Sequence, residues 1–180
     1  MKTSNGANIL QIGNLILRKK SEEIPPGKIA SKETKELIQK MSETLRGQPQ
    51  GIGLSAIQIG VPKTIFIVSN YAFDPKSLDA KDNEETIKEK KKKETYSIFI
   101  NPRIIKQSKK QKILYEGCLS VAETFGKIKR STNVTLEAYG ENGVKFRRGT
   151  GGLLAQIIQH EMDHLGGALF TDKIIKERKT

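Results

Sequence analysis

The sequence predicts an α+β fold, with short antiparallel strands in the middle of the chain and one helix towards each end. Short runs rich in Ile, Val and Phe recur along the middle and are typical of strands. A stripe of apolar residues with helical spacing precedes these runs. At Gly151 the period of the apolar pattern changes from about 2 to about 3.6 residues, which predicts a second helix.

The N-terminal part is expected to be extended over residues 8–18 and to turn at Pro25-Pro26, before the first helix. Ser31 is a suitable N-cap for this helix, because its hydroxyl can accept a hydrogen bond from an amide of the first turn. Gly47 and Pro49 end the helix. Its apolar stripe, which we expect to pack in the core, consists of Leu37, Ile38, Met41 and Leu45.

Five short runs are the strand candidates: residues 64–68, 97–100, 112–115, 133–139 and 144–147. Glu141-Asn142-Gly143 predicts a hairpin turn between the last two, which makes them antiparallel. The segment 74–94, between the first two, holds seven lysines and seven acidic residues. It lacks the apolar residues needed to bury itself, so we expect a mobile loop or a solvated hairpin tip.

The composition is that of one domain, residues 1–180, that needs no disulfide. The single Cys118 cannot form an intramolecular bridge, no signal peptide is evident, and no apolar stretch approaches the roughly 20 residues that span a bilayer. We therefore expect a cytoplasmic protein with a reduced thiol and no membrane partner.

The formal net charge of +12 favours an acidic partner, and an acid-free basic run begins at Arg103. No aromatic residues are interleaved with the basic ones to stack bases. A basic surface of this kind is expected to face RNA, and no specific DNA binding is expected. The basic residues concerned are Arg103, Lys106, Lys109, Lys110, Lys112, Lys127, Lys129, Arg130, Lys145, Arg147 and Arg148.

Both histidines of the chain lie in one pentapeptide of the second helix, residues 160–164 (HEMDH). Residues i and i+4 share a helix face, so His160 and His164 can bind one cation with Glu161 beside it. This layout is typical of metal-activated hydrolases. Leu153 and Ile157 continue the same face, which places the metal at the edge of an apolar pocket.

A third ligand distinguishes the classes of site. The three-histidine zinc peptidases need a histidine at position 170, where this chain has Phe170. A downstream glutamate is disfavoured, since Glu177 is the only one that follows His164. Cys118 is the remaining soft ligand, and two imidazoles with one thiolate leave a coordination position open for water.

Three segments, 51–58 (GIGLSAIQ), 116–120 (EGCLS) and 159–164 (QHEMDH), resemble in order and spacing the three motifs of peptide deformylases. The chain departs from the usual motifs at Ser55, where the family usually has Ala, at Ala122 and at Leu15, where Pro is usual. None of these changes removes a group that the reaction needs. The resemblance, together with the predicted elements, leads us to expect antiparallel sheets that surround the C-terminal metal-binding helix.

The resemblance implies hydrolysis of the N-formyl group from the formyl-methionine of nascent polypeptides, with release of formate. One divalent ion is expected on Cys118, His160 and His164. The resemblance favours Fe²⁺ in the cell, whereas the ligand types also suit Zn²⁺, Ni²⁺ or Co²⁺. Glu161 would act as acid and base. The Gln58 amide and the Leu119 N–H would bind the oxyanion, as the resemblance assigns.

The methionine side chain is expected in an apolar pocket, and the peptide backbone along Ile52-Gly53 and near Leu119 as an added strand. The residues expected to form the pocket are Ile52, Leu114, Leu153 and Ile157.

Around the site, Glu116 and Arg130 are expected to pair, Asp163 either orients a ligand or faces solvent, and Tyr115 and Phe125 are expected to be packing residues. Two alternatives remain: a general metallopeptidase, and a non-catalytic metal-binding or ribosome-associated module. Glu161 and Gln58 count against the second, since a binding role needs neither.

Overall fold

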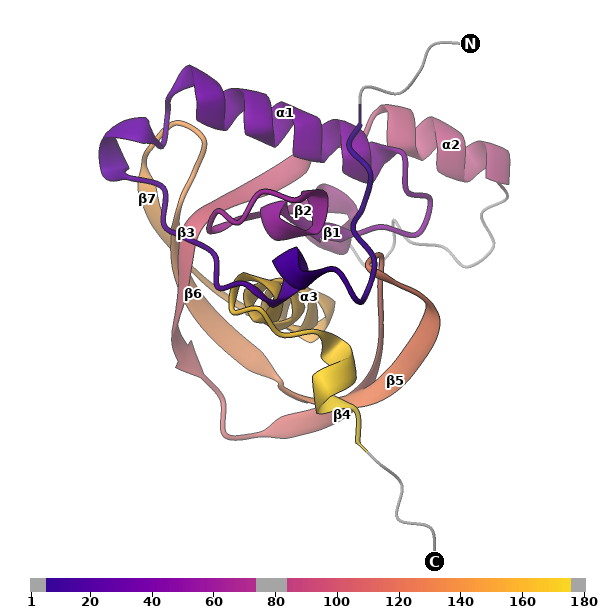
Figure 1. The fold of residues 1–180 in the computed structure, drawn as a ribbon. Helices are drawn as coiled ribbons and strands as arrows, with labels where there is room; N and C mark the ends of the chain where they lie inside the picture. Colours follow the sequence, from indigo (N-terminus) through magenta and orange to yellow (C-terminus); the bar gives the residue numbers. More distant parts are fainter. Residues whose placement is uncertain (1–5, 74–83, 176–180) are drawn as a thin grey trace, which may run out of the picture.

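The computed structural model describes residues 6–73 and 84–175 (Figure 1). Its α-helices are α1 (Lys32–Arg46), α2 (Glu84–Lys92) and α3 (Gly152–Leu165). Its strands are β1 (Gly53–Ser55), β2 (Ile65–Ser69), β3 (Tyr96–Gln107), β4 (Gln111–Cys118), β5 (Val121–Ser131), β6 (Asn133–Tyr139) and β7 (Lys145–Gly151). Short 3-10 helices are η1 (Leu15–Arg18), η2 (Pro26–Lys28), η3 (Ala56–Ile59), η4 (Asn70–Phe73) and η5 (Phe170–Lys173).

The strands form two antiparallel sheets, which confirms the α+β class. Within the described residues, one sheet has the order β1-β2-β3-β6-β7 and the other is the β4–β5 hairpin. Figure 1 shows α3 enclosed between the five-stranded sheet and the curved hairpin, with α1 on the far side of β1 and β2. α3 is therefore flanked by both sheets.

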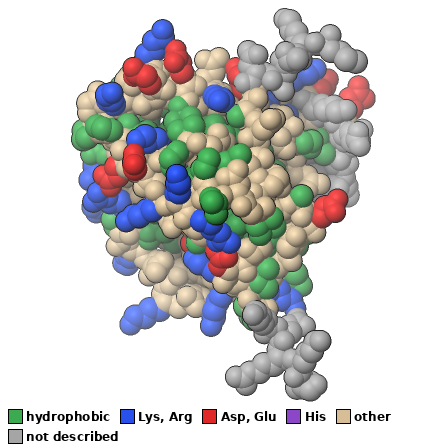
Figure 2. All heavy atoms as spheres, viewed as in Figure 1, with side chains coloured by type: hydrophobic (Ala, Val, Ile, Leu, Met, Phe, Trp, Pro, Cys, Tyr) green, Lys and Arg blue, Asp and Glu red, His purple; other side chains and the backbone are tan. Residues whose placement is uncertain are grey.

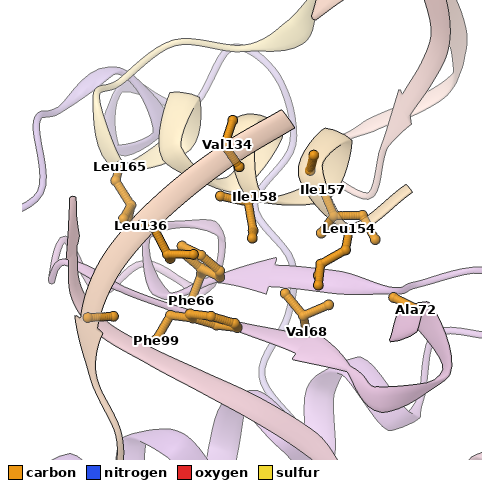
Figure 3. Packing of buried hydrophobic residues seen from close by; sticks show 12 residues of the cluster. Phe66, Val68, Ala72, Phe99, Val134, Leu136, Leu154, Ile157, Ile158 and Leu165 are labelled. Carbon is orange, nitrogen blue, oxygen red and sulfur yellow. The ribbon is translucent and has the colours of Figure 1, made fainter. Parts of the chain in front are cut away.

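The core lies on both faces of β2, which explains why all five of its residues are buried. On one face, Phe66 and Phe99 stack with their ring centroids 4.7 Å apart, beneath Ile158 of α3 (Figure 3). On the other face, Ile65 and Ile67 pack in a cluster that includes apolar residues of α1. Apolar packing on the first of these faces fixes the position of α3 against the sheet.

Several predicted elements are confirmed. Ser31 caps α1 by accepting a hydrogen bond from the amide of Thr34 at 3.3 Å. The predicted strand 133–139 is β6 with the same bounds, while β3, β4 and β7 are longer than predicted. The extended segment 8–18 ends in η1, which buries Leu17.

Two strands were not predicted. β1 is only three residues long. In β5 the side that faces inward carries Gly126, Ile128 and Arg130, so the alternation of apolar and polar residues is concealed.

The prediction for the charged segment 74–94 is wrong over its described part. Residues 74–83 lie outside the described residues, but 84–92 form α2. Lys91 and Glu94 are buried and form an ion pair of 3.0 Å. Because the two opposite charges compensate each other, this stretch can pack although it carries few apolar residues.

No helix in residues 6–73 or 84–175 has the length and apolar character needed to cross a membrane.

Ile158→Ala is expected to lower the free energy of unfolding by about 2–5 kcal/mol, because it removes a fully buried side chain between α3 and the sheet. Urea unfolding followed by circular dichroism measures the change. Ile113→Ala, at a position 59% exposed, is the control and should change stability by less than about 0.5 kcal/mol. Equal effects of the two substitutions would contradict the described packing.

Candidate active site

Three potential metal ligands converge between the hairpin and α3. Cys118 is the last residue of β4, and His160 and His164 are one turn apart on α3. The Nε2 atom of His164 lies 3.2 Å from Cys118 Sγ and 3.2 Å from His160 Nε2. The ligand atoms of all three residues lie within 4.8 Å of one another.

These distances suit a tetrahedral cation. Bonds of about 2.0–2.1 Å to nitrogen and 2.3 Å to sulfur hold neighbouring ligand atoms roughly 3.3–3.6 Å apart. Glu116 Oε2 lies 3.0 Å from His160 Nδ1, which leaves Nε2 of that ring directed at the other two ligands. Electron-rich atoms this close together repel one another unless a proton or a cation lies between them, so the donor set fits a divalent metal.

The two histidines have opposite pKa shifts. Burial opposes the charged form of His160, but hydrogen bonds with Cys118 and Glu116 outweigh it and raise the pKa of His160 to about 10. Burial and the neighbouring charge of His160 lower the pKa of His164 to about 3, so its ring is neutral. A cation held by His160 Nε2 would face Cys118, whereas Glu116 stays at Nδ1 on the other side of the ring.

A buried ion-pair network supports His160. Arg130 donates to both carboxylate oxygens of Glu116 at 2.7 Å, which confirms the expected pair. Burial alone would raise the pKa of Glu116, but its bonds with Arg130 and His160 lower it to about 2. Asp163 accepts from Arg130 at 2.7 Å and from Lys173 at 2.5 Å. Asp163 is thus part of the support for the ligand and does not stand free in solvent.

Glu161 lies beside the cluster and is 3% exposed. Its side chain is held by Ser55, a contact that the sequence did not predict. The Ser55 hydroxyl donates to Glu161 Oε2 at 2.6 Å. A Cβ at Gly53 would lie 2.5 Å from Glu161 Oε1, so any larger residue there would displace this carboxylate. Burial raises the pKa of Glu161, and the charge of His160 and the Ser55 hydrogen bond partly oppose this. One carboxylate oxygen is therefore anchored and the other faces the segment at Gly53.

The Gln58 side chain has a fixed orientation. Its Oε1 accepts the Ser55 amide at 2.8 Å, and its Nε2 therefore points to Ser120 Oγ at 3.1 Å and Cys118 Sγ at 3.6 Å. Leu119 follows Cys118 in the turn between β4 and β5. The structure thus brings Gln58, Leu119 and the three ligands to one place.

A cavity of about 440 Å³ opens onto these residues. Four residues predicted to bind substrate line it: Ile52, Gly53, Leu153 and Ile157. Leu114 is not among the lining residues; it lies half-buried on β4 opposite Ile128.

Two aromatic residues depart from their expected role as packing residues. Tyr115 and Phe125 are each 70% exposed and line the cavity mouth. The alternation of β4 could have revealed this for Tyr115, since its neighbour Glu116 faces inward.

Comparison with known proteins decides the family. A model of the polypeptide deformylase family matches residues 7–180. The chain belongs to this family. It is 41% identical to the peptide deformylase of Karelsulcia muelleri, over 92% of this chain and 77% of that protein. It is 37% identical to that of Flavobacterium psychrophilum, over 95% of this chain and 84% of that protein.

Solved peptide deformylases have the same fold. The enzyme of Plasmodium falciparum is 35% identical with a TM-score of 0.75, over 94% of this chain and 87% of that one. A class I type b enzyme of Acinetobacter baumannii is 25% identical with a TM-score of 0.78, over 96% and 100%. The chain is accordingly a metal-dependent hydrolase with deformylase function, and the family acts on nascent formylated peptides.

Glu116→Gln is expected to weaken Zn²⁺ binding about 10- to 100-fold, because the deformylase would lose the carboxylate that orients His160. Competition with a chromophoric chelator at fixed pH measures the affinity. Glu141→Gln, which removes the same charge from the exposed β6–β7 turn, should leave the affinity unchanged. An unchanged affinity in Glu116→Gln would show that His160 does not need this support.

Proposed function

We propose that Cys118, His160 and His164 hold one divalent ion and that Glu161 and Gln58 use it to hydrolyse the formyl group of N-formylmethionyl peptides. The observation that supports this most directly is the cluster of two imidazoles and one thiolate, open to a cavity and with a buried carboxylate beside it. A structural zinc site has four protein ligands, whereas three leave a position for water.

The ion would supply the Lewis acidity that lowers the pKa of water and polarises the formyl carbonyl. Glu161 takes the proton of the attacking water and returns it to the departing amine. Ser55 anchors Oε2 of Glu161, so Oε1, on the side of Gly53, is the oxygen that exchanges the proton. The burial that raises the pKa of Glu161 helps the carboxyl to hold this proton until the amine leaves.

The negative charge that develops on the formyl oxygen needs donors that are already in place. The Nε2 group of Gln58 is one, since the Ser55 amide turns it towards Cys118. The backbone N–H of Leu119, next to the thiolate ligand, is the second. Their role in the reaction rests on this placement.

The peptide would bind between two strand edges. Within the described residues β1 pairs only with β2 and β4 only with β5, and residues at or next to the ends of both strands line the cavity. An extended peptide can therefore add as a strand beside Ile52-Gly53, with its methionine side chain against Ile157 and Leu153. The related enzyme of Acinetobacter baumannii has been crystallised with Met-Ala-Ser bound, which supports this substrate class.

Fe²⁺ is our proposal for the ion in the cell, although the ligand set also suits Zn²⁺, Ni²⁺ and Co²⁺. A reduced thiolate ligand fits the cytoplasm. Figure 2 shows Lys and Arg side chains scattered over one face, with Asp and Glu side chains among them, and a transient contact with ribosomal RNA would use such basic side chains.

Glu161→Gln should reduce formate release from formyl-Met-Ala-Ser about 10²- to 10⁴-fold, because the site loses its acid and base. The protein is loaded with Ni²⁺ or Fe²⁺ under anaerobic conditions, and formate is measured with a coupled dehydrogenase. Metal content must equal that of the parent, and Glu85→Gln on α2 should retain full activity. Robust turnover by Glu161→Gln would sink the proposed mechanism, and cleavage of unformylated peptides would favour a general metallopeptidase.

Gln58→Met should lower kcat by about 10²- to 10³-fold with little change in KM, because the lost donor acts on charge that forms only during the reaction. Steady-state kinetics on the same peptide measure both constants. If bound metal declines in parallel with kcat, Gln58 supports the ligands instead of the oxyanion.

A further inference from the structure

The charged segment predicted to be a solvated loop contains a buried lysine. Lys91, near the end of α2, is 9% exposed, whereas the adjacent Lys92 and Lys93 are exposed. Its ammonium group donates to the carbonyl oxygen of Gly51 at 2.7 Å and to Glu94 Oε1 at 3.0 Å. Lys91 is thus bound to the backbone of Gly51, a residue that lines the cavity.

Glu94 is the centre of a compact polar cluster behind the cavity. Its side chain is 1% exposed and accepts hydrogen bonds from Lys91, from the Ser69 hydroxyl and from the Tyr96 hydroxyl, the last at 2.7 Å. Every charge in the cluster therefore has a partner. A buried pair of this kind is weak evidence of stability, because desolvation of the two charges offsets their attraction. What it supplies is a fixed position for the groups that it holds.

The group held by Lys91 belongs to the substrate side of the site. Gly51 and Ile52 lead into β1 and line the cavity with Gly53. The same cluster holds the next carbonyl as well, since the Ser69 amide donates to the oxygen of Ile52 at 2.9 Å. Two consecutive carbonyls are thus tied to one buried cluster on the side of α2 and β2.

Segment 51–53 has little room to move, because neighbouring side chains lie close to its backbone. A Cβ at Gly51 would lie 2.7 Å from Leu45 and 3.1 Å from Leu119, and one at Gly53 would lie 2.5 Å from Glu161. Segment 51–53 is therefore closely packed against α1, against the turn that follows Cys118 and against Glu161. A small displacement would change the width of the place where the peptide backbone is proposed to bind.

We propose that Lys91 is a positioning residue that braces the peptide-binding segment 51–53 from the insert helix α2 and thereby sets the affinity for the peptide. This inference rests on the proposed function, because it takes segment 51–53 to be the place where the peptide adds as a strand. Lys91 touches neither substrate nor metal in this scheme. It acts through the carbonyl of Gly51.

The kinetic test uses the metal-loaded enzyme and its variant Lys91→Met, which keeps the length of the side chain and removes the ammonium group. KM for formyl-Met-Ala-Ser should rise about tenfold with kcat within about twofold of the parent, as expected for loss of ground-state binding by a charge-assisted hydrogen bond. With formyl-Met-amide, which has no downstream residues, the rise should stay below about threefold. Lys92→Met, which loses the same charge from the exposed next residue, should match the parent.

A second variant keeps the test decisive if Lys91→Met folds poorly because Glu94 is left without its cation. Lys91→Met combined with Glu94→Gln removes both charges and leaves Ser69 and Tyr96 a hydrogen-bond acceptor. It should show the same rise in KM. Unchanged KM in the double variant, or an equal rise with both substrates, would overturn the proposal.

Amide hydrogen exchange tests whether Lys91 holds segment 51–53 in place, independently of the enzyme's activity. The amides of segment 51–55 should exchange faster in either Lys91 variant than in the parent, and those of β6 should not change. Equal exchange in segment 51–55 would overturn the brace whatever the activity. A parent that releases no formate overturns the proposed function, and with it the claim on peptide affinity.

Discussion

The pair between Glu116 and Arg130 ties the β4–β5 hairpin to α3, because Glu116 contacts His160 and Arg130 contacts Asp163. Both residues belong to the β4–β5 hairpin, and Glu116 also contacts His160 on α3. A buried charge that loses its partner costs about 3–5 kcal/mol, so the hairpin cannot slide along the helix without a large penalty. Cys118 lies two residues beyond Glu116 and is thereby held opposite the histidines. The placement of the three candidate ligands therefore depends on this carboxylate.

α3 serves both the core and the chemistry, and the two demands conflict. Ile158 and Leu165 pack against the sheet, while Glu161 and His164 on the same helix are also buried. Buried ionisable groups oppose folding unless they find partners. Ser55 is such a partner for Glu161, and a bound cation would be one for His164. Metal binding should therefore contribute to the stability of the fold as well as to catalysis.

The sequence predicted the parts of this protein in which local pattern and chemistry agree. α1, β6 and α3 have clear periodicity, α1 also has its cap at Ser31, and the residues 118, 160 and 164 stand out because the chain has so few soft ligands. β5 was missed because an inward-facing arginine paired with Glu116 looks polar in sequence. Lys91 and Ser55 were missed for the same reason: each is buried by a partner distant in the chain. Such contacts depend on tertiary packing that no local pattern contains.

Within residues 6–73 and 84–175, β1 and β4 each present one strand edge without a partner strand near the cavity. β1 and β4 end separate sheets, and an exposed edge is a template for any extended chain. A peptide bound between them could form backbone hydrogen bonds on both of its sides. The five-stranded sheet and the hairpin would then become one continuous surface around α3, with the substrate as the missing strand. Occupancy of the site would complete the architecture of the protein for as long as the peptide stays bound.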